Sequence, residues 1–229
     1  MQNKIALCFC LWQRTELEKI VIYYYKSIQD QYNFDICIVG SEGIKSQSIA
    51  SGCNYIEFPN LPVSDKHNRL AQMAKGYKGA VLIGSDDLIE PKLFEYYHSL
   101  GNSGNTYYGF PDVYYWQPKQ NRVSYWNGLF MGAGRYFPKS VLEKTNFNLW
   151  RSGLNKGLDT SCRTLLDTKG MKISQTTLKE LDAVIMDVKG FGSISSEGIV
   201  QAGINQNGNQ DISLLNRFPK FVIEQIKQL

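Results

Sequence analysis

Apolar runs alternate with amphipathic stretches along the first hundred residues of the chain. Thr15–Gln29 and Asp65–Tyr77 repeat their apolar residues at helical spacing, which predicts two amphipathic helices. Around them lie short runs of adjacent apolar residues, typical of strands that are buried on both faces. These predicted strands are Ile5–Leu11, Phe34–Val39, Asn54–Phe58 and Ala80–Ile83. Repeated strand–helix units predict an α/β fold with a parallel sheet covered on both sides.

The second half of the chain follows a different pattern. Thr106–Trp116 and Arg122–Trp126 flank a polar, proline-containing segment, 117–121, and this arrangement predicts a β-hairpin. We expect one domain, 1–229, made of two halves, 1–100 and 101–229. The other predicted elements are helices at Pro138–Lys144, Leu158–Asp167 and Pro219–Leu229, strands at Met171–Ser174 and Ala183–Val188, and a glycine-rich loop at Ile194–Asp211.

Composition places the chain among ordinary globular proteins. The sequence is 43% hydrophobic and 20% charged, which is typical of a soluble domain. The net charge is +4 and is spread along the chain, so we expect no nucleic-acid partner, although anionic substrates are compatible with it. No segment reaches membrane-spanning length; the C-terminal helix is expected to dock on the domain, with a dimer contact or a membrane surface as alternatives.

The cysteines and histidines argue against a zinc site. The five cysteines include no Cys-x-x-Cys pair, and the chain has only two histidines. Reduced, partly buried thiols in a cytoplasmic protein are the simplest interpretation.

The most informative stretch is 81–91, Val-Leu-Ile-Gly-Ser-Asp-Asp-Leu-Ile-Glu-Pro. A predicted strand runs directly into Asp86 and Asp87, and Pro91 then begins a predicted helix. Carboxylates held at a rigid strand end are suitable ligands for Mg²⁺ or Mn²⁺ beside a bound phosphate. A solvated turn that caps the following helix is the alternative. Glu42 follows the second predicted strand, so it is expected at the same edge of the sheet, where parallel sheets bind ligands.

The order of these features resembles a family-2-type glycosyltransferase of the GT-A fold. The resemblance covers roughly residues 3 to 195. Stretch 84–91 matches that family's Asp-x-Asp-Asp segment, except that Gly84 replaces the first acid. The other matching pieces are Cys10-Leu11-Trp12-Gln13-Arg14, Val39-Gly40-Ser41-Glu42-Gly43, Lys66-His67-Asn68, Gly132-Ala133-Gly134-Arg135, Gly157-Leu158-Asp159 and Val188-Lys189-Gly190 with Ser193.

The resemblance implies a GT-A (nucleotide-diphospho-sugar transferase) architecture, a Rossmann-like sandwich with a mostly parallel central sheet. It also implies a nucleotide-sugar donor, preferably a UDP-sugar, and a carbohydrate or other hydroxyl acceptor. A divalent ion would neutralise the charge that develops on the leaving nucleoside diphosphate. Residues 1–100 would bind the nucleotide sugar and residues 101–229 the acceptor.

The same resemblance assigns roles to individual residues. Asp86 would bind Mg²⁺ or Mn²⁺, and Asp159 would be the general base of an inverting transfer. Each residue also has a structural alternative, such as an Asp favoured at a helix N-terminus or a solvated charge at a strand end. Residues expected to contact the donor are Glu42, Lys66, Asn68, Ser85, Asp87 and Lys189; Asn68 alternatively anchors its helix.

Aromatic residues are dense in the second half of the chain. Most are expected in the core or in cross-strand pairs, with one or two exposed at a cleft as a platform for a sugar. This group consists of Tyr107, Tyr108, Phe110, Tyr114, Tyr115, Trp116, Tyr125, Trp126 and Phe130.

Two other functions compete with glycosyl transfer. A nucleotidyltransferase also uses carboxylates and metal, but it normally has a glycine-rich basic loop after the first strand, where this chain has Trp12-Gln13-Arg14. A non-catalytic binding protein on the same fold is the other alternative. Gly84 and Leu158, which depart from the family's acidic residues, favour that alternative.

Overall fold

The computed structural model describes residues 3–101, 104–128, 132–191 and 207–229. Its larger sheet has seven strands in the order β10-β6-β9-β4-β1-β2-β3. The pairs from β4 to β3 are parallel, whereas β9 is antiparallel to both of its neighbours. The bounds are β1 Ile5–Cys10, β2 Phe34–Gly40, β3 Asn54–Glu57, β4 Gly79–Leu82, β6 Thr106–Gly109, β9 Arg135–Pro138 and β10 Lys172–Gln175. The predicted, mostly parallel central sheet is therefore confirmed.

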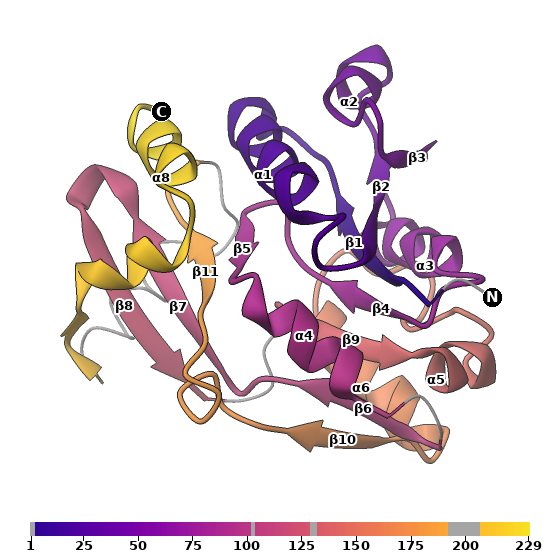
Figure 1. Ribbon diagram of the computed structural model, residues 1–229. Helices are drawn as coiled ribbons and strands as arrows, with labels where there is room; N and C mark the ends of the chain where they lie inside the picture. Colours follow the sequence, from indigo (N-terminus) through magenta and orange to yellow (C-terminus); the bar gives the residue numbers. More distant parts are fainter. Residues whose placement is uncertain (1–2, 102–103, 129–131, 192–206) are drawn as a thin grey trace.

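The inner strands β1, β2 and β4 of this sheet are buried on both faces, as the apolar runs predict, whereas the edge strands β3 and β10 are partly exposed. The expectation of burial on both faces was therefore wrong for the predicted strand Asn54–Phe58. In β1, Ile5 and Leu7 face one core while Ala6 and Cys8 face the other, and all four are inaccessible to solvent. The first core includes α1 (Thr15–Ile28) and α4 (Lys92–Ser99). The second core includes α3 (Val63–Met73), α5 (Lys139–Lys144) and α6 (Leu158–Thr168) (Figure 1). A short helix, α2 (Ile44–Ile49), follows β2.

A second sheet of five strands has the order β12-β8-β7-β11-β5. Its strands are β5 (Asp87–Ile89), β7 (Asp112–Gln117), β8 (Arg122–Asn127), β11 (Ile185–Val188) and β12 (Asn209–Gln210). The predicted hairpin is confirmed as β7 and β8, joined through the 3₁₀ turn η1 (Pro118–Gln120). Asn121 closes this turn with a φ of 46°, a left-handed conformation that asparagine tolerates better than most residues.

Two predicted segments differ from the structure. Thr106–Trp116 is wrong as a single strand, because the chain leaves the larger sheet after Gly109 and enters the second sheet at Asp112. Phe110-Pro111 separates the two strands, and proline has no N–H for a continued ladder. Most of the predicted loop Ile194–Asp211 lies outside the described residues, and the remainder contains β12.

The C-terminal helix docks on the domain, as predicted. α8 (Lys220–Lys227) follows the 3₁₀ segment η2 (Ile212–Arg217) and lies beside α1 (Figure 1). Val222 and Ile226 are fully buried, and the Phe221 ring lies 5.2 Å from that of Tyr23. The helix therefore uses its apolar stripe within the chain.

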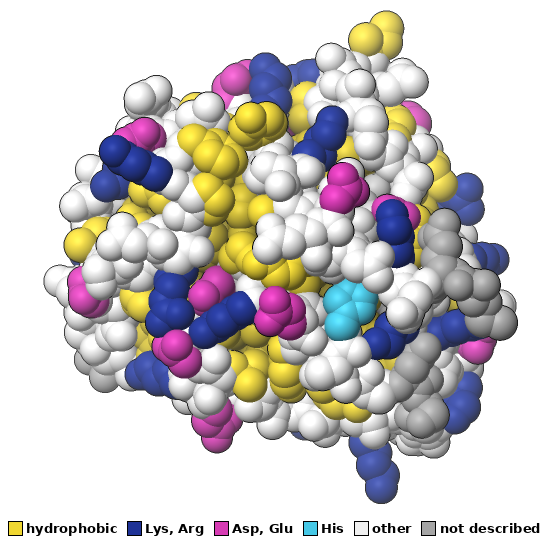
Figure 2. Space-filling model, viewed as in Figure 1, with side chains coloured by type: hydrophobic (Ala, Val, Ile, Leu, Met, Phe, Trp, Pro, Cys, Tyr) yellow, Lys and Arg dark blue, Asp and Glu magenta, His cyan; other side chains and the backbone are white. Residues whose placement is uncertain are grey.

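The charged side chains are dispersed over the visible surface, as expected from their spread along the sequence. On the face seen in Figure 2, basic and acidic side chains are interspersed, with hydrophobic side chains between them. None of the helices among the described residues has the length and apolarity needed to cross a membrane.

Candidate active site

Three carboxylates meet where the second sheet adjoins the end of β4. Asp86 lies in the β4–β5 connection, Asp87 begins β5, and Asp187 lies in β11. Asp187 is directly opposite Asp87 in the antiparallel β5–β11 ladder. Each residue offers a carboxylate oxygen within 4.8 Å of those of the other two. Strand pairing therefore brings together carboxylates that lie far apart in the sequence.

Two tyrosines of α1 hold the strand that carries Asp87. The Tyr24 hydroxyl donates to the carbonyl of Ile89 at 2.5 Å, and the Tyr25 hydroxyl donates to the carbonyl of Asp87 at 2.9 Å. The Tyr25 oxygen also accepts the Ile89 N–H at 2.9 Å. Because β5 is at the end of its sheet, these bonds replace those of a missing neighbouring strand. The first helix thus fixes the position of the carboxylates.

Two basic side chains pair with the carboxylates. Arg14, just before α1, lies 2.7 Å from Asp86 Oδ2 through Nη1. Lys189, just after β11, lies 2.6 Å from Asp187 Oδ2 and 4.0 Å from Asp86 Oδ2. Three carboxylates thus face two cations.

Burial and repulsion between the carboxylates raise the pKa of Asp87 and of Asp187. Burial, and then the charge of Asp86, raise the pKa of Asp87 to about 6. The same causes, with Asp87 added, raise the pKa of Asp187 well above its usual value. Asp187 Oδ1 is buried and has no hydrogen-bond partner among the described residues. Hard oxygen donors with excess negative charge and an unused oxygen fit a divalent cation such as Mg²⁺ or Mn²⁺.

Gly84 is packed against two of these carboxylates. Its N–H donates to Asp87 Oδ2 at 2.5 Å. A Cβ atom at position 84 would lie 2.6 Å from Asp86 Oδ1 and 3.1 Å from Asp87 Oδ2. The present carboxylates therefore crowd the position from which a side chain at residue 84 would begin.

A cavity of about 390 Å³ connects the carboxylates with Asp159. Asp159 lies in the first turn of α6, and its carboxylate pairs with the guanidinium of Arg135, a buried residue of β9. A Cβ at Gly132 would approach Asp159 Oδ1 to 2.9 Å and Arg135 Nη2 to 3.0 Å, so a glycine allows this ion pair to form. The lining comprises His67, Leu82, Ile83, Gly84, Asp86, Asp87, Val113, Tyr115, Gly132, Ala133, Arg135, Trp150, Leu158, Asp159 and Asp187.

Glu42, a predicted donor-binding residue, connects two loops beside the sheet. Its carboxylate accepts the Gln13 N–H at 2.9 Å and the Lys45 ammonium at 3.0 Å. Burial of Glu42 acts to raise its pKa, but the Gln13 hydrogen bond and the Lys45 ammonium outweigh burial and lower the pKa.

Lys66 and Asn68, at the start of α3, direct their polar atoms into the protein. Lys66 is 1% exposed, and its ammonium donates to the Leu11 carbonyl at 2.8 Å and to Asn60 Oδ1 at 3.1 Å. Asn68 accepts the N–H groups of Leu149 and Trp150 at 2.9 and 3.0 Å and donates to the Trp150 carbonyl at 2.9 Å. Asn68 therefore anchors the segment that leads to α6.

Glu18, in α1, lies near Ser85, the residue before Asp86. Burial raises the pKa of the Glu18 carboxyl, while the hydrogen bond from the Trp12 N–H and the nearby Ser85 hydroxyl oppose that rise. The Trp12 N–H lies 2.7 Å from Glu18 Oε1. The turn before α1 and the Asp86 loop thus share one buried acid.

Most of the aromatic group is buried. Trp116 is fully buried, and Tyr114 and Tyr125 pack 5.1 Å apart across the hairpin. Tyr115 lines the cavity, while Phe130 lies outside the described residues. The cavity is therefore lined by two aromatic side chains, Tyr115 and, unforeseen from the sequence, Trp150, both almost fully buried; the Trp150 ring lies 5.1 Å from that of His67.

Sequence reasoning missed Asp187, the third carboxylate. A single acid inside the apolar run Ala183–Val188 was the available signal. A carboxylate in a buried strand needs a partner. Asp187 lies far from Asp87 in the sequence, so the sequence alone did not show that the two face each other.

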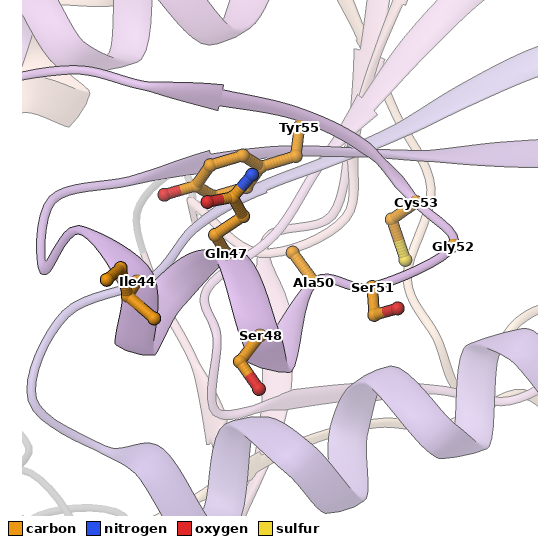
Figure 3. A pocket seen from close by; sticks show the side chains of 8 residues that line it. All are labelled: Ile44, Gln47, Ser48, Ala50, Ser51, Gly52, Cys53 and Tyr55. Carbon is orange, nitrogen blue, oxygen red and sulfur yellow. The ribbon is translucent and has the colours of Figure 1, made fainter.

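A larger hollow, of about 640 Å³, lies away from this chemistry. Figure 3 shows its lining on α2 and the start of β3, with Gln47 beneath the Tyr55 ring. Its lining residues, Ile44, Gln47, Ser48, Ala50, Ser51, Gly52, Cys53 and Tyr55, include no charged side chain. The smaller cavity is therefore the better candidate active site.

Comparison with known proteins identifies the fold. No family model matches the sequence, and no curated protein matches it. The structure is similar to a glycosyltransferase involved in the glycosylation of the major capsid of PBCV-1. That similarity has a TM-score of 0.52 and 11% identity, and it covers 89% of this chain and 99% of the other.

A second similar structure is a mutant Drosophila β-1,4-galactosyltransferase 7 in complex with manganese, UDP-Gal and xylobiose. The TM-score is 0.51 and the identity 14%, over 76% of this chain and 64% of that chain. At these identities the likeness shows the fold. The chain has the α/β fold of GT-A glycosyltransferases.

Proposed function

We propose that the protein is a glycosyltransferase that moves a sugar from a nucleotide-diphosphate donor to a hydroxyl acceptor. One observation carries this proposal: the carboxylate group of Asp86, Asp87 and Asp187 shares a single cavity with Asp159. A cation site and a separate carboxylate base within one cavity are what a metal-assisted sugar transfer requires. The fold shared with glycosyltransferases supports the same proposal.

The donor would bind on the side of the cavity formed by residues 1–100 and β11. Asp86 would hold Mg²⁺ or Mn²⁺, which when bound stabilises negative charge on the leaving diphosphate. Lys189 and Arg14 supply positive charge at the same place, and both already lie within 4.0 Å of carboxylate oxygens there. A UDP-sugar is the preferred donor, because UDP-Gal is bound in one of the similar structures.

The acceptor would bind on the side formed by residues 101–229. Asp159 would remove the proton from the acceptor hydroxyl, while that oxygen attacks the anomeric carbon and the nucleoside diphosphate leaves. An attack from the face opposite the leaving group inverts the configuration. Arg135 would keep the Asp159 carboxylate charged and oriented, and Tyr115 and Trp150 would provide walls for a sugar.

The remaining donor residues would act around this cavity. Glu42 would contact the nucleotide from the loop after β2, and Asp87 and Ser85 would orient the metal loop. Lys66 and Asn68 would support the site through the loops that they anchor, because their polar atoms are bonded to backbone and side-chain oxygens inside the protein.

A donor titration tests the proposal. Thermal shifts are measured with UDP-sugars and other nucleotide sugars, with and without Mn²⁺, on the wild type and on Asp86→Ala. We expect one donor to raise the melting temperature in a metal-dependent way, and Asp86→Ala to abolish that rise. No shift with any donor would contradict the proposal. Donor binding without turnover on any hydroxyl acceptor, including xylobiose, would instead support a non-catalytic binding protein.

A further inference from the structure

The proposed metal loop of this chain lacks an acid at position 84, and the structure shows which carboxylate a side chain there would displace. A Cβ at Gly84 would lie 2.6 Å from Asp86 Oδ1, closer than side-chain carbons approach other atoms. The Gly84 N–H also donates to Asp87 Oδ2 at 2.5 Å, so the glycine backbone itself holds one carboxylate. The backbone of Gly84 therefore helps to position the Asp87 carboxylate.

A carboxylate from another strand reaches the same group. Asp187 lies opposite Asp87 in the β5–β11 ladder, and its oxygen is within 4.8 Å of those of Asp86 and Asp87. Its Oδ2 pairs with Lys189 at 2.6 Å, while its Oδ1 is buried without a hydrogen-bond partner among the described residues. A buried carboxylate oxygen without a partner is costly, and a cation would relieve that cost.

Building on the proposed function, we infer that Asp187 supplies the metal-binding carboxylate that position 84 lacks. The ion is held between two paired strands, by Asp86 from the β4–β5 loop and Asp187 from β11. Asp87, bonded to the Gly84 N–H, orients the loop. Divalent ions of this class are bound by few carboxylates and several waters, so two direct carboxylates are enough.

The test measures Mn²⁺ binding alone, by the loss of the free-ion electron paramagnetic resonance signal. Asp187→Asn is expected to weaken Mn²⁺ binding by roughly ten- to hundredfold, since even residues that only support a ligand have effects of this size. Asp182→Asn is the matched control, because Asp182 is exposed, lies five residues earlier in the same segment and is not in the carboxylate group. Its Mn²⁺ affinity is expected to remain at the wild-type value.

A second variant tests whether residue 187 touches the ion. In Asp187→Cys, a thiolate would replace the carboxylate, and thiolates prefer softer ions. We expect weaker Mn²⁺ binding together with new Cd²⁺ binding, seen as a thiolate-to-cadmium ultraviolet absorption that the wild type lacks. The wild-type titration controls for the five native cysteines. If Asp187 had only a structural role, Asp187→Cys would weaken Mn²⁺ binding without creating Cd²⁺ binding, and that result would contradict the inference.

A third variant examines position 84 directly. Gly84→Asp combined with Asp187→Asn returns an acid to the loop, yet it is expected not to restore Mn²⁺ binding, because a side chain at residue 84 would displace the Asp86 carboxylate from its present position. Restored binding would contradict the crowding at residue 84, but it would support Asp187 as the substitute for an acid in the loop. Wild-type Mn²⁺ affinity in Asp187→Asn alongside lost affinity in Asp86→Asn would overturn the inference, although the proposed function would then stand.

If the wild type binds no Mn²⁺, with or without UDP, the inference is overturned together with the metal part of the proposed function. In that case UDP binding is measured without metal, and its presence would still support the donor site. Circular dichroism confirms folding of each variant. Asp187→Asn is expected to fold, because asparagine matches the shape of aspartate and its amide oxygen can still accept a hydrogen bond from Lys189.

Discussion

The guanidinium of Arg135, in β9, pairs with the carboxylate of Asp159, in the first turn of α6. Arg135 is 3% exposed, so the proposed base is paired with a buried cation. The pair joins an inner strand of the larger sheet to the start of a helix on its surface. In the proposed transfer, it would therefore fix where an acceptor hydroxyl must lie to lose its proton.

Asp159→Asn is expected to abolish transfer while donor binding is retained. Loss of a positioned carboxylate base costs roughly 10²–10⁴-fold in rate. The measurement is sugar transfer under saturating donor, alongside the donor-induced thermal shift. Asp167→Asn is the control, since Asp167 lies on the same helix, is exposed and pairs only with Arg163 among the described residues. Activity in Asp159→Asn equal to that of the control would remove Asp159 as the base.

Arg135→Lys keeps the charge but loses the planar fork of the guanidinium. We expect the turnover number to fall by roughly ten- to hundredfold, because a shift of the base by about an ångström has effects of this size. The Michaelis constant for the donor should be unchanged, since the ion pair that Arg135 forms among the described residues is with Asp159, on the proposed acceptor side. An increase in that constant with unaltered turnover would place Arg135 in donor binding instead.

His67 predicts a pH dependence of stability. Burial, and then the charges of Lys66 and Arg135, lower the pKa of His67 from its usual 6.5 to about 4. Between these values the unfolded chain binds a proton that the folded chain does not, so the free energy of unfolding decreases as the pH falls from 6.5 towards 4. Above pH 6.5 this contribution to the pH dependence vanishes.

The measurement is urea denaturation at several pH values between neutral and pH 4. His98 is replaced by glutamine in both proteins, because burial also lowers its pKa. Against that background, His67→Gln is expected to lose less stability on acidification than the protein with His67. Parallel curves for the two proteins would show that His67 is protonated equally in the folded and unfolded states.

Asn68→Ala tests the anchor of the segment before α6. The variant leaves the buried N–H groups of Leu149 and Trp150 without their acceptor, and unmade buried bonds cost about 1–3 kcal/mol each. We expect a loss of about 2–4 kcal/mol in the free energy of unfolding, measured with urea. Arg69→Ala, at the next and less buried position, should change it by less than about 0.5 kcal/mol. Similar losses in both variants would indicate weakening of α3 as a whole.

Some parts of the fold followed directly from the sequence. Ile5–Leu11 and Phe34–Val39 predicted β1 and β2 because strands buried on both faces need an unbroken apolar run. The helix predicted at Thr15 begins at that residue. In these elements the local pattern and the tertiary environment favour the same structure.

Other parts depended on contacts that no local pattern reveals. β5 begins at Asp87, whose charge conceals a strand that is stabilised by the tyrosines of α1 and by β11. Arg135 and Asp187 are single charged residues in apolar runs, and only the folded chain shows that each faces a carboxylate. The sequence therefore pointed to Asp86 and Asp159, which line one cavity, but it did not reveal the charged residues beside them.

The strand break at Phe110-Pro111 has a consequence for rate. It separates β6, which shares a sheet with the Arg135 strand, from β7, which shares a sheet with Asp87 and Asp187. In the proposed transfer, the spacing between leaving group and base would thus depend on how the two sheets pack. Substitutions remote from every ligand, at the seam between the sheets, should alter turnover while leaving ligand affinity intact.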